Sequence, residues 1–309
     1  MKLGLRLCGA NIIALSRKTT SMNLKLLKKG IQMRARLSSV VRSESRITSI
    51  AGNISKVARA ALDEANQLTV EEIDIGLKRL PEGLDGMRVV HLSDIHHSPF
   101  VDLEHIDRTV EISNSLQPDL IVLTGDFVSH EKEYISPMAR ALSELTAPMG
   151  VYACLGNHDH WTDPDAVTGE LTDNGIRVLI NEGERIETDA GSFWMCGVDD
   201  YMVGKTDVSA AISGSEEHEA KLMLAHNPVI IRQAAKRGVD LMFSGHTHGG
   251  QVKLKRNEDG GLMKSIRMRN GLHRRYETQV YITRGIGTVV VPIRYQCPPE
   301  ISHITLRRA

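Results

Sequence analysis

Residues 88–96, which read RVVHLSDIH, set a pattern that the rest of the chain repeats. A short apolar run leads directly into Asp94 and His96, whose side chains can bind metal ions or move protons. The same arrangement recurs in LIVLTGD (120–126), VYACLGNHD (151–159), KLMLAH (221–226) and LMFSGHTH (241–248). Because the carboxyl ends of strands in an open α/β sheet meet at a common crevice, we expect these polar residues to come together in space.

Apolar runs and helical patterns alternate along the chain from about residue 69. We predict strands over Met87–Leu92, Asp119–Leu123, Val151–Leu155, Phe193–Val198, Lys221–Leu224, Val239–Phe243 and Val280–Thr283. We predict helices over Leu103–Leu116, Tyr134–Leu145, Asp163–Asn174 and Pro228–Arg237. Strands that alternate with helices indicate a layered α/β domain.

The residues that end these runs form a mixed set of metal ligands. They are Asp94, His96, Asp126, Asn157, His226, His246 and His248. Carboxylate, imidazole and amide ligands together suit Mn, Fe or Zn better than Ca or Mg, which prefer oxygen alone. Two cations about 3.5–4 Å apart need a shared anion, and the two oxygens of Asp126 make it the predicted bridge. The sequence therefore predicts two divalent metal ions that activate a bridging water to hydrolyse a phosphate ester.

The five blocks resemble the D-x-H, G-D, G-N-H-D/E, H and G-H-x-H pattern of the calcineurin-like metallophosphoesterases, and all five are intact. The resemblance implies a layered sandwich of two central β-sheets flanked by helices. It implies one metal ion bound by Asp94, His96, Asp126 and His248, and a second bound by Asp126, Asn157, His226 and His246. It also implies that His158 contacts the scissile phosphate or protonates the leaving group, with Asp159 orienting His158.

Further motifs are similar to those of the YkuE/YaeI-type branch of this family, over roughly residues 71–308. They are Leu80-Pro81, Leu84 to Arg88, SGHTHGGQ (244–251), TRGIG (283–287), Pro292-Ile293-Arg294 and Pro299-Glu300-Ile301. That branch consists of membrane-associated phosphodiesterases, with relatives that cleave the pyrophosphate bond of UDP-diacylglucosamine. The resemblance implies hydrolysis of a phosphodiester or pyrophosphate bond in a lipid-linked or nucleotide-sugar-like substrate.

Two other functions stay open at this point. A metallonuclease would cleave single-stranded nucleic acid with strong salt dependence, and a non-catalytic scaffold would be marked by a lost ligand, which is not seen. The basic segment Lys253–Arg275 has only Tyr276 nearby for base stacking, so nucleic acid is not the favoured partner. His97 and Trp161 adjoin the blocks and are candidates for substrate contact, with a structural role for His97 and core packing for Trp161 as the alternatives.

The first 65 of the 309 residues differ in charge from the rest of the chain. Residues 1–60 contain thirteen Lys and Arg but the single acid Glu44, so we expect a basic arm over 1–65 and a metallophosphoesterase domain over 66–309. The amphipathic pattern of Met22–Arg42 fits peripheral membrane binding, and the composition also fits an organelle-targeting segment or a disordered tail. Since no run of eighteen apolar residues exists, we predict a peripheral membrane or cytoplasmic protein.

The overall composition, 41% hydrophobic and 25% charged, is typical of a globular protein. The four cysteines, Cys8, Cys154, Cys196 and Cys297, form no C-x-x-C pair, so neither a structural zinc site nor a disulfide framework is predicted. Cys154 and Cys196 lie in apolar runs and are expected in the core. Aromatic residues make up only 4% of the chain, and no oligomeric state is predicted from them.

Overall fold

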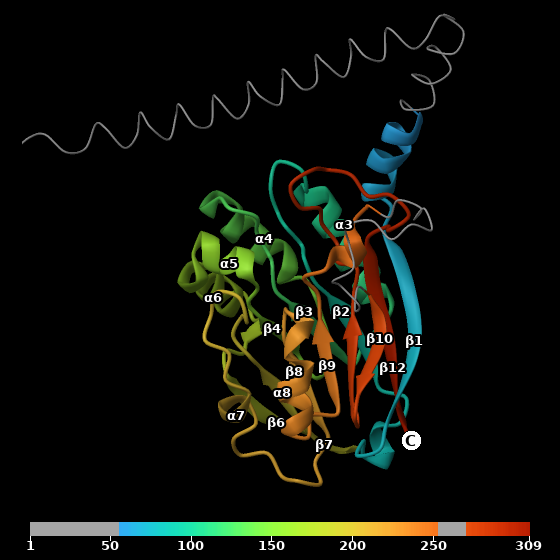
Figure 1. The fold of residues 1–309 in the computed structure, drawn as a ribbon, viewed down its shortest axis with the longest axis vertical. Coiled ribbons are helices and arrows are strands. Elements are labelled where there is room, and N and C mark those ends of the chain that lie inside the picture. The colour runs from blue at the N-terminus through green and yellow to red at the C-terminus, as the bar shows by residue number, and fades with distance from the viewer. Residues whose placement is uncertain (1–55, 253–269) are drawn as a thin grey trace, which may run out of the picture. The chain divides into compact units, whose positions relative to one another are not determined.

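Two six-stranded sheets dominate a computed structural model of the chain, which describes residues 56–252 and 270–309 (Figure 1). By its internal contacts the chain divides into residues 1–58 and 59–309, and both sheets belong to the second part. Residues 1–55 of the predicted basic arm and residues 253–269 of the basic segment lie outside the described residues. The division into an arm and a domain therefore stays a prediction.

The first sheet has the strand order β1-β12-β2-β3-β4-β5, and the second has the order β10-β11-β9-β8-β7-β6. The first contains β1 (Thr69–Leu77), β2 (Arg88–Leu92), β3 (Leu120–Thr124), β4 (Val151–Cys154), β5 (Arg177–Val178) and β12 (Glu300–Arg308). The second contains β6 (Glu182–Thr188), β7 (Gly191–Gly197), β8 (Lys221–Leu224), β9 (Leu241–Ser244), β10 (Gly271–Arg275) and β11 (Thr278–Ile282).

Helices connect most of the parallel strands. They are α3 (Leu103–Ser115), α4 (Ile135–Leu142), α5 (Asn157–Thr162), α6 (Pro164–Asp173), α7 (Val208–Ala211) and α8 (Ile231–Lys236). Short 3-10 turns precede α4 and α8 at η2 (Lys132–Tyr134) and η3 (Pro228–Ile230), and two more follow strands β1 and β9 at η1 (Glu82–Leu84) and η4 (His248–Gly250). Helix α3 begins where the Asp102 side chain accepts a hydrogen bond from the backbone N–H of His105, which satisfies an otherwise unpaired donor of the first turn.

The central strands of both sheets are parallel and buried on both faces. In the first sheet β2, β3 and β4 pair in parallel, and in the second β7, β8, β9 and β11 do the same. Every residue of β3, β4, β8 and β9 is buried, which explains why these strands are continuous apolar runs in the sequence. Their carboxyl ends all lie at one edge of the sandwich.

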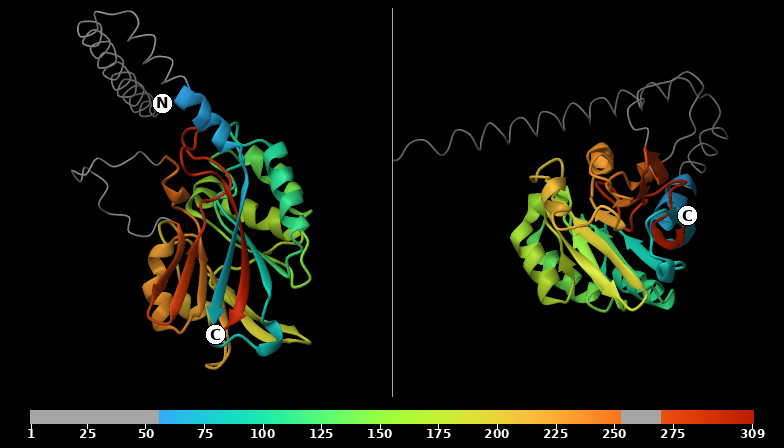
Figure 2. Two further views of the ribbon diagram at one scale, coloured as in Figure 1. Left: turned by 90° about the vertical axis from the view of Figure 1, so that its right-hand side faces the viewer. Right: turned by 90° about the horizontal axis from the view of Figure 1, so that it is seen from below.

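The two sheets pack against each other, and helices cover their outer faces (Figure 2). Val89 and Val122 of the first sheet and Leu222 and Phe243 of the second belong to the core between them. A second core lies between the first sheet and α3, α4 and α6, and a third lies between the second sheet and α7 and α8. The predicted α/β sandwich of two sheets flanked by helices is confirmed.

The sequence-based prediction omitted β1, β5, β6, β10 and β12, as well as helices α5 and α7. β1 lies at the edge of its sheet, and mainly its last residues, among them Ile75 and Leu77, are buried. Its charged residues Glu71, Glu72 and Asp74 break the apolar run that marks a central strand. Edge strands of this kind carry a weaker pattern than strands buried on both faces.

No helix within residues 56–252 or 270–309 is long and apolar enough to cross a bilayer. Among the described residues Cys154, Cys196 and Cys297 are buried and free, so the core positions predicted for Cys154 and Cys196 are confirmed.

Candidate metal centre

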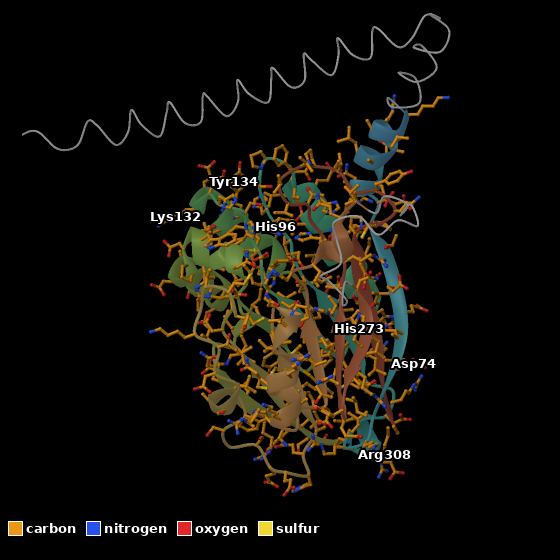
Figure 3. All side chains as sticks on the ribbon, in the orientation of Figure 1. Asp74, His96, Lys132, Tyr134, His273 and Arg308 are labelled. Carbon is orange, nitrogen blue, oxygen red and sulfur yellow. The ribbon has the colours of Figure 1, made fainter. Side chains whose placement is uncertain are left out.

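The polar residues that end the strands come together at the carboxyl edge of the two sheets. The first sheet supplies Asp94 and His96 after β2, Asp126 after β3 and Asn157 after β4, and the second supplies His226 after β8 with His246 and His248 after β9. Figure 3 shows His96 at the end of the sandwich opposite to Arg308, the last residue of β12. The structure thus gathers residues that are up to 154 positions apart in the chain.

The backbone at this edge is held in an unusual conformation. Asp94, His96, Asp126, His246 and His248 all have positive φ, between 48° and 68°. Non-glycine residues rarely adopt this left-handed region, and such strain gathers at functional sites when neighbouring structure enforces it. Here the backbone N–H groups of Asp94 and His96 donate to the carbonyl oxygens of Gly125 and Asp126, at 2.9 and 3.0 Å. These hydrogen bonds between neighbouring loops fix the backbone positions from which the ligand side chains extend.

Two glycines allow the loops to approach one another. A Cβ atom on Gly156 would overlap the carboxylate of Asp126, and one on Gly245 would overlap the side chains of Ser93 and Asp94. The requirement at these positions is close approach rather than an unusual φ.

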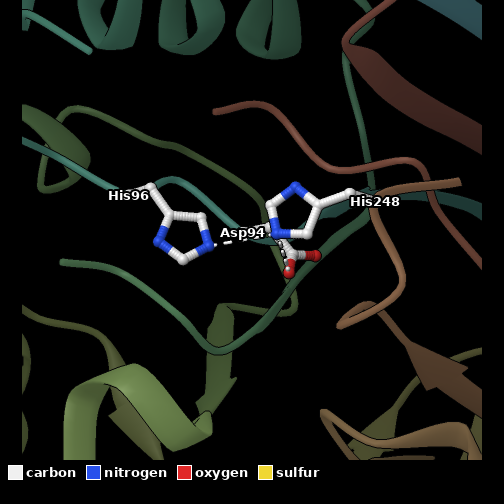
Figure 4. Close-up of side chains that lie close together, drawn as sticks. All are labelled: Asp94, His96 and His248. Carbon is white, nitrogen blue, oxygen red and sulfur yellow. Dashed lines mark hydrogen bonds and ion pairs between the residues drawn. The ribbon is translucent and has the colours of Figure 1, made fainter. Parts of the chain in front are cut away.

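One cluster of ligand atoms consists of Asp94, His96 and His248 (Figure 4). His248 Nε2 lies 3.2 Å from Asp94 Oδ1 and 3.1 Å from His96 Nε2. All three side chains are buried. The three atoms lie within 4.8 Å of one another, a spacing that one metal ion can span.

A second cluster consists of Asp126, His226 and His246. His226 Nε2 lies 3.2 Å from Asp126 Oδ2 and 3.2 Å from His246 Nδ1. Asp126 Oδ2 is also 3.6 Å from His96 Nε2, so one carboxylate oxygen faces both clusters. The other oxygen, Oδ1, accepts a hydrogen bond of 2.8 Å from the backbone N–H of His158.

The tautomer of His226 is set by its surroundings. Its Nδ1–H donates to the Thr124 carbonyl oxygen at 2.7 Å, because a carbonyl oxygen can only accept. Nε2 of the neutral ring then carries a lone pair that faces the lone pairs of Asp126 Oδ2. Such an arrangement requires a cation between the two atoms, either a proton or a metal ion.

The electrostatics of the site reflect this arrangement. Burial acts to lower the pKa of His226, but the charge and hydrogen bond of Asp126 outweigh it and raise that pKa to about 10. Burial acts to raise the pKa of Asp126, but His226 and His96 lower it below its usual value. For His96 burial prevails and lowers the pKa to about 3. The neutral imidazole of His96 is the form that binds a metal ion.

Asn157 provides a further sign of a missing ligand partner. Its Oδ1 atom is buried and has no hydrogen-bond partner among the residues that the structure describes. A buried acceptor without a partner costs free energy, which a bound cation would recover. The residues present therefore fit divalent metal ions.

His158 and Asp159 have separate roles. The Nδ1–H of His158 donates to the Ser129 carbonyl oxygen at 2.9 Å, whereas the Asp159 carboxylate accepts from the backbone N–H groups of Asp126, Phe127 and Gly156 at 2.8, 2.8 and 2.9 Å. Asp159 thereby binds the start of α5, the helix that carries His158, and its role in orienting His158 stays a prediction. Asp159 also anchors the loop that carries Asp126.

The two candidates for substrate contact have different surroundings. His97 is buried, its Nδ1 atom lies 2.9 Å from the Tyr134 carbonyl oxygen, and its ring packs edge-on against the ring of Tyr134 at 4.8 Å. This is the structural alternative for His97, so the prediction of substrate contact is not supported there. Trp161 is 50% exposed with its ring centroid 4.7 Å from that of His158, which contradicts core packing.

Three residues at the site escaped the sequence-based prediction. Thr124 and Ser129 act through backbone carbonyl oxygens, which every residue has, so the sequence does not indicate which of them accept hydrogen bonds at the site. His130 is exposed, and its ring centroid lies 5.0 Å from that of His158. A histidine four residues after Asp126 on a loop carries no periodic signal that would have selected it.

Comparison with known proteins adds an independent line of support. The sequence model of the family described as calcineurin-like phosphoesterase matches residues 87–250. The metallophosphoesterase YkuE of Bacillus subtilis is 31% identical over 79% of this chain and 87% of its own length. Phosphodiesterase YaeI of Escherichia coli is 34% identical over 71% of this chain and 82% of its own length. A transmembrane protein with metallophosphoesterase domain from Danio rerio is 33% identical, and the chain spans 57% of its length.

Proposed function

This chain belongs to the calcineurin-like phosphoesterase family, and we propose that it hydrolyses phosphodiester or pyrophosphate bonds at a centre for two divalent metal ions. One ion would be bound by Asp94, His96, Asp126 and His248, and the other by Asp126, Asn157, His226 and His246. Two ions there would offset the charge of the phosphate and lower the pKa of a water molecule between them. The mixture of carboxylate, imidazole and amide favours Mn, Fe or Zn.

The observation that carries the proposal is the position of Asp126. Its Oδ2 atom faces His226 Nε2 at 3.2 Å and His96 Nε2 at 3.6 Å, so a cation bound by either histidine would also be close to the Asp126 carboxylate. Because the two histidines belong to different clusters, Asp126 is the natural bridge. Asp159 supports this role by binding the backbone N–H groups of Asp126 and Phe127.

His158 is the proposed general acid. With Nδ1–H engaged by Ser129, a second proton on the imidazole must be at Nε2, and the His158 side chain belongs to a group with His96 and Asp126 whose ligand atoms lie within 4.8 Å of one another. The proton at Nε2 would pass to the oxygen of the departing group as its bond to phosphorus breaks. This step matters most for leaving groups with a high pKa.

A lipid-linked or nucleotide-sugar-like substrate is the finer part of the proposal. Exposed apolar side chains occur in loops and in helix α5 after the carboxyl ends of the parallel strands, at the edge that carries the centre: Phe100, Trp161, Tyr201, Met202, Val203, Val290 and Val291. Exposed apolar groups near a site favour a ligand or membrane with apolar character. The basic arm would add peripheral membrane contact, directed at anionic lipid headgroups.

The test is hydrolysis of bis(p-nitrophenyl) phosphate and p-nitrophenyl phosphate by metal-stripped full-length protein, before and after addition of Mn. We expect turnover only with the metal, and faster turnover of the diester than of the monoester. A faster rate on single-stranded DNA, with steep loss at higher salt, would instead indicate a nuclease. Absence of metal-dependent turnover on all three substrates would support a non-catalytic scaffold and contradict the proposal.

A further inference from the structure

Three aromatic rings form a wall at the edge of the metal centre. The centroid of His158 lies 4.7 Å from that of Trp161 and 5.0 Å from that of His130. The rings of His130 and Trp161 are within 21° of parallel, with centroids 6.4 Å apart. The proposed general acid therefore has a flat aromatic surface beside it.

Two contacts hold the segments of the wall in place. The loop that carries His130 is tied to the end of α5 by an ion pair of 2.5 Å between Lys132 Nζ and Asp163 Oδ2. From α5 itself, His160 Nε2 lies 2.7 Å from Asp199 Oδ1 of the loop after β7. The two rings belong to segments about 30 residues apart that are held together before any ligand arrives, which reduces the entropy cost of binding.

The wall is open to solvent. Trp161 is 50% exposed and His130 is also exposed, whereas the ring of His158 between them and the metal ligands is buried. A tryptophan that leaves half of its surface in water beside a catalytic edge offers a large apolar face to a ligand. Since His158 would protonate the leaving group, the rings beside it face that half of the substrate.

We propose that His130 and Trp161 form a subsite for a flat conjugated ring, such as a nucleobase, on the leaving-group side of the centre. The inference rests on the proposed phosphoesterase function and extends it to a class of substrate. Stacking of a base on an aromatic side chain strengthens binding by about 5- to 150-fold and tolerates different bases, because every base has a π-face.

The test compares two ligands that differ only by a base, AMP and ribose 5-phosphate, in equilibrium binding to the Mn-loaded full chain. We expect AMP to bind at least about 10-fold more tightly. Trp161→Ala and His130→Ala should each reduce that preference to below about threefold, while the affinity for ribose 5-phosphate stays the same. Tyr276→Ala is the matched control, since Tyr276 is an exposed aromatic residue at the β10–β11 turn, 71% exposed.

Fluorescence provides a readout that does not depend on turnover. The chain has two tryptophans, and Trp194 is buried with its indole N–H donating to the Ala211 carbonyl oxygen at 3.0 Å. AMP should therefore quench emission from Trp161, and the quenching should vanish in Trp161→Phe. Equal affinities for AMP and ribose 5-phosphate in the wild type, or a preference that survives Trp161→Ala, would overturn the subsite. Metal-dependent turnover of bis(p-nitrophenyl) phosphate, measured in parallel, shows separately whether the phosphoesterase function stands.

Discussion

The two edges of the sandwich differ in how their buried charged and polar groups are paired. At the carboxyl edge, a proton or a metal ion must lie between Asp126 Oδ2 and the facing His226 Nε2, and Asn157 Oδ1 has no partner among the described residues. At the opposite edge, Arg185 Nε donates to Glu219 Oε1 at 2.7 Å, and Arg79 Nε donates to Asp240 Oδ1 at 3.0 Å. The first edge is incomplete without a cation, and the second is satisfied by the protein alone.

The difference shows how one fold separates function from stability. Ion pairs with complete hydrogen bonding tolerate partial burial, whereas unpaired polar atoms cost free energy unless a ligand satisfies them. The left-handed backbone of five ligand residues is confined to loops at the carboxyl edge. We therefore expect substitutions at the carboxyl edge to change activity and metal content, and substitutions at the opposite edge to change stability alone.

The largest effect is expected for Asp126→Asn, which breaks the carboxyl edge at its centre. Loss of one bridging charge should lower turnover of bis(p-nitrophenyl) phosphate by about 1000-fold or more and reduce the content of both metal ions. Metal content is measured by mass spectrometry after dialysis, and turnover is measured with Mn. Asp107→Asn, at an exposed position of α3, is the control and should match the wild type. Two metal ions retained in Asp126→Asn would contradict the bridging role.

His158→Ala should separate catalysis from metal binding within the same edge. We expect unchanged metal content and a loss of about 100-fold or more in kcat for a phenyl leaving group. The loss in kcat should be smaller for a p-nitrophenyl leaving group, which departs as p-nitrophenolate and needs no proton. Rates are compared for the two aryl diesters, with His218→Ala as the control because His218 is exposed near the opposite edge. Equal losses on both substrates would remove His158 from the role of general acid.

His91 sharpens the comparison because it is a buried histidine outside both clusters. Its Nε2 atom lies 2.8 Å from Thr124 Oγ1, and burial lowers its pKa from 6.5 to about 3. The unfolded chain then binds more protons between these values, so stability is complete above pH 6.5 and falls as the pH drops toward 3.

From pH 7 to pH 5 this histidine should remove about 2 kcal/mol of the free energy of unfolding. Between pH 7 and pH 5 the free energy of unfolding of His91→Gln should fall by about 2 kcal/mol less than that of the wild type. The measurement is urea unfolding of metal-free protein. The control His218→Gln, at an exposed site, should follow the wild type. Identical pH dependence in His91→Gln and the wild type would show that this imidazole does not limit acid stability.

The smallest effect is expected at the opposite edge, for Glu219→Gln. Glu219 is buried and pairs with Arg185, so its loss should lower the free energy of unfolding by about 1–2 kcal/mol with kcat unchanged. Glu82→Gln is the control, because Glu82 pairs with Arg308 at the surface and should change stability by less than about 0.5 kcal/mol. A clear drop in kcat for Glu219→Gln would break the division between the two edges.

Much of the fold was predictable because the central strands are buried on both faces. β3, β8 and β9 read as uninterrupted apolar runs, and their predicted bounds agree with the structure within two residues. β1 and β12 were missed because polar residues, among them Glu71, Asp74, Ser302 and Thr305, interrupt their apolar runs. Helix α5 was missed because its six residues, NHDHWT, are site residues rather than a periodic apolar face.

The candidate site was predictable in its ligand types and less so in its contacts. Asp94, His96, Asp126, His226, His246 and His248 all appear in the two clusters. The contacts of Asp159 were not predictable, because its carboxylate accepts hydrogen bonds from backbone N–H groups of the loop after β3, up to 33 residues earlier in the chain. His97 turned out to pack on Tyr134, 37 residues further along the chain.

The sequence by itself determined where the buried parallel strands lie and which carboxylates, imidazoles and amides follow them. A strand that is buried on both faces is a continuous apolar run, and the end of that run marks the end of the strand. Only the tertiary structure decided that Asp126 Oδ2 faces both His96 and His226, that the Thr124 carbonyl selects the tautomer of His226, and that His130 lies beside Trp161. These contacts join loops from separate strands. Their distances depend on how the strands align and how the two sheets pack, which no local pattern encodes.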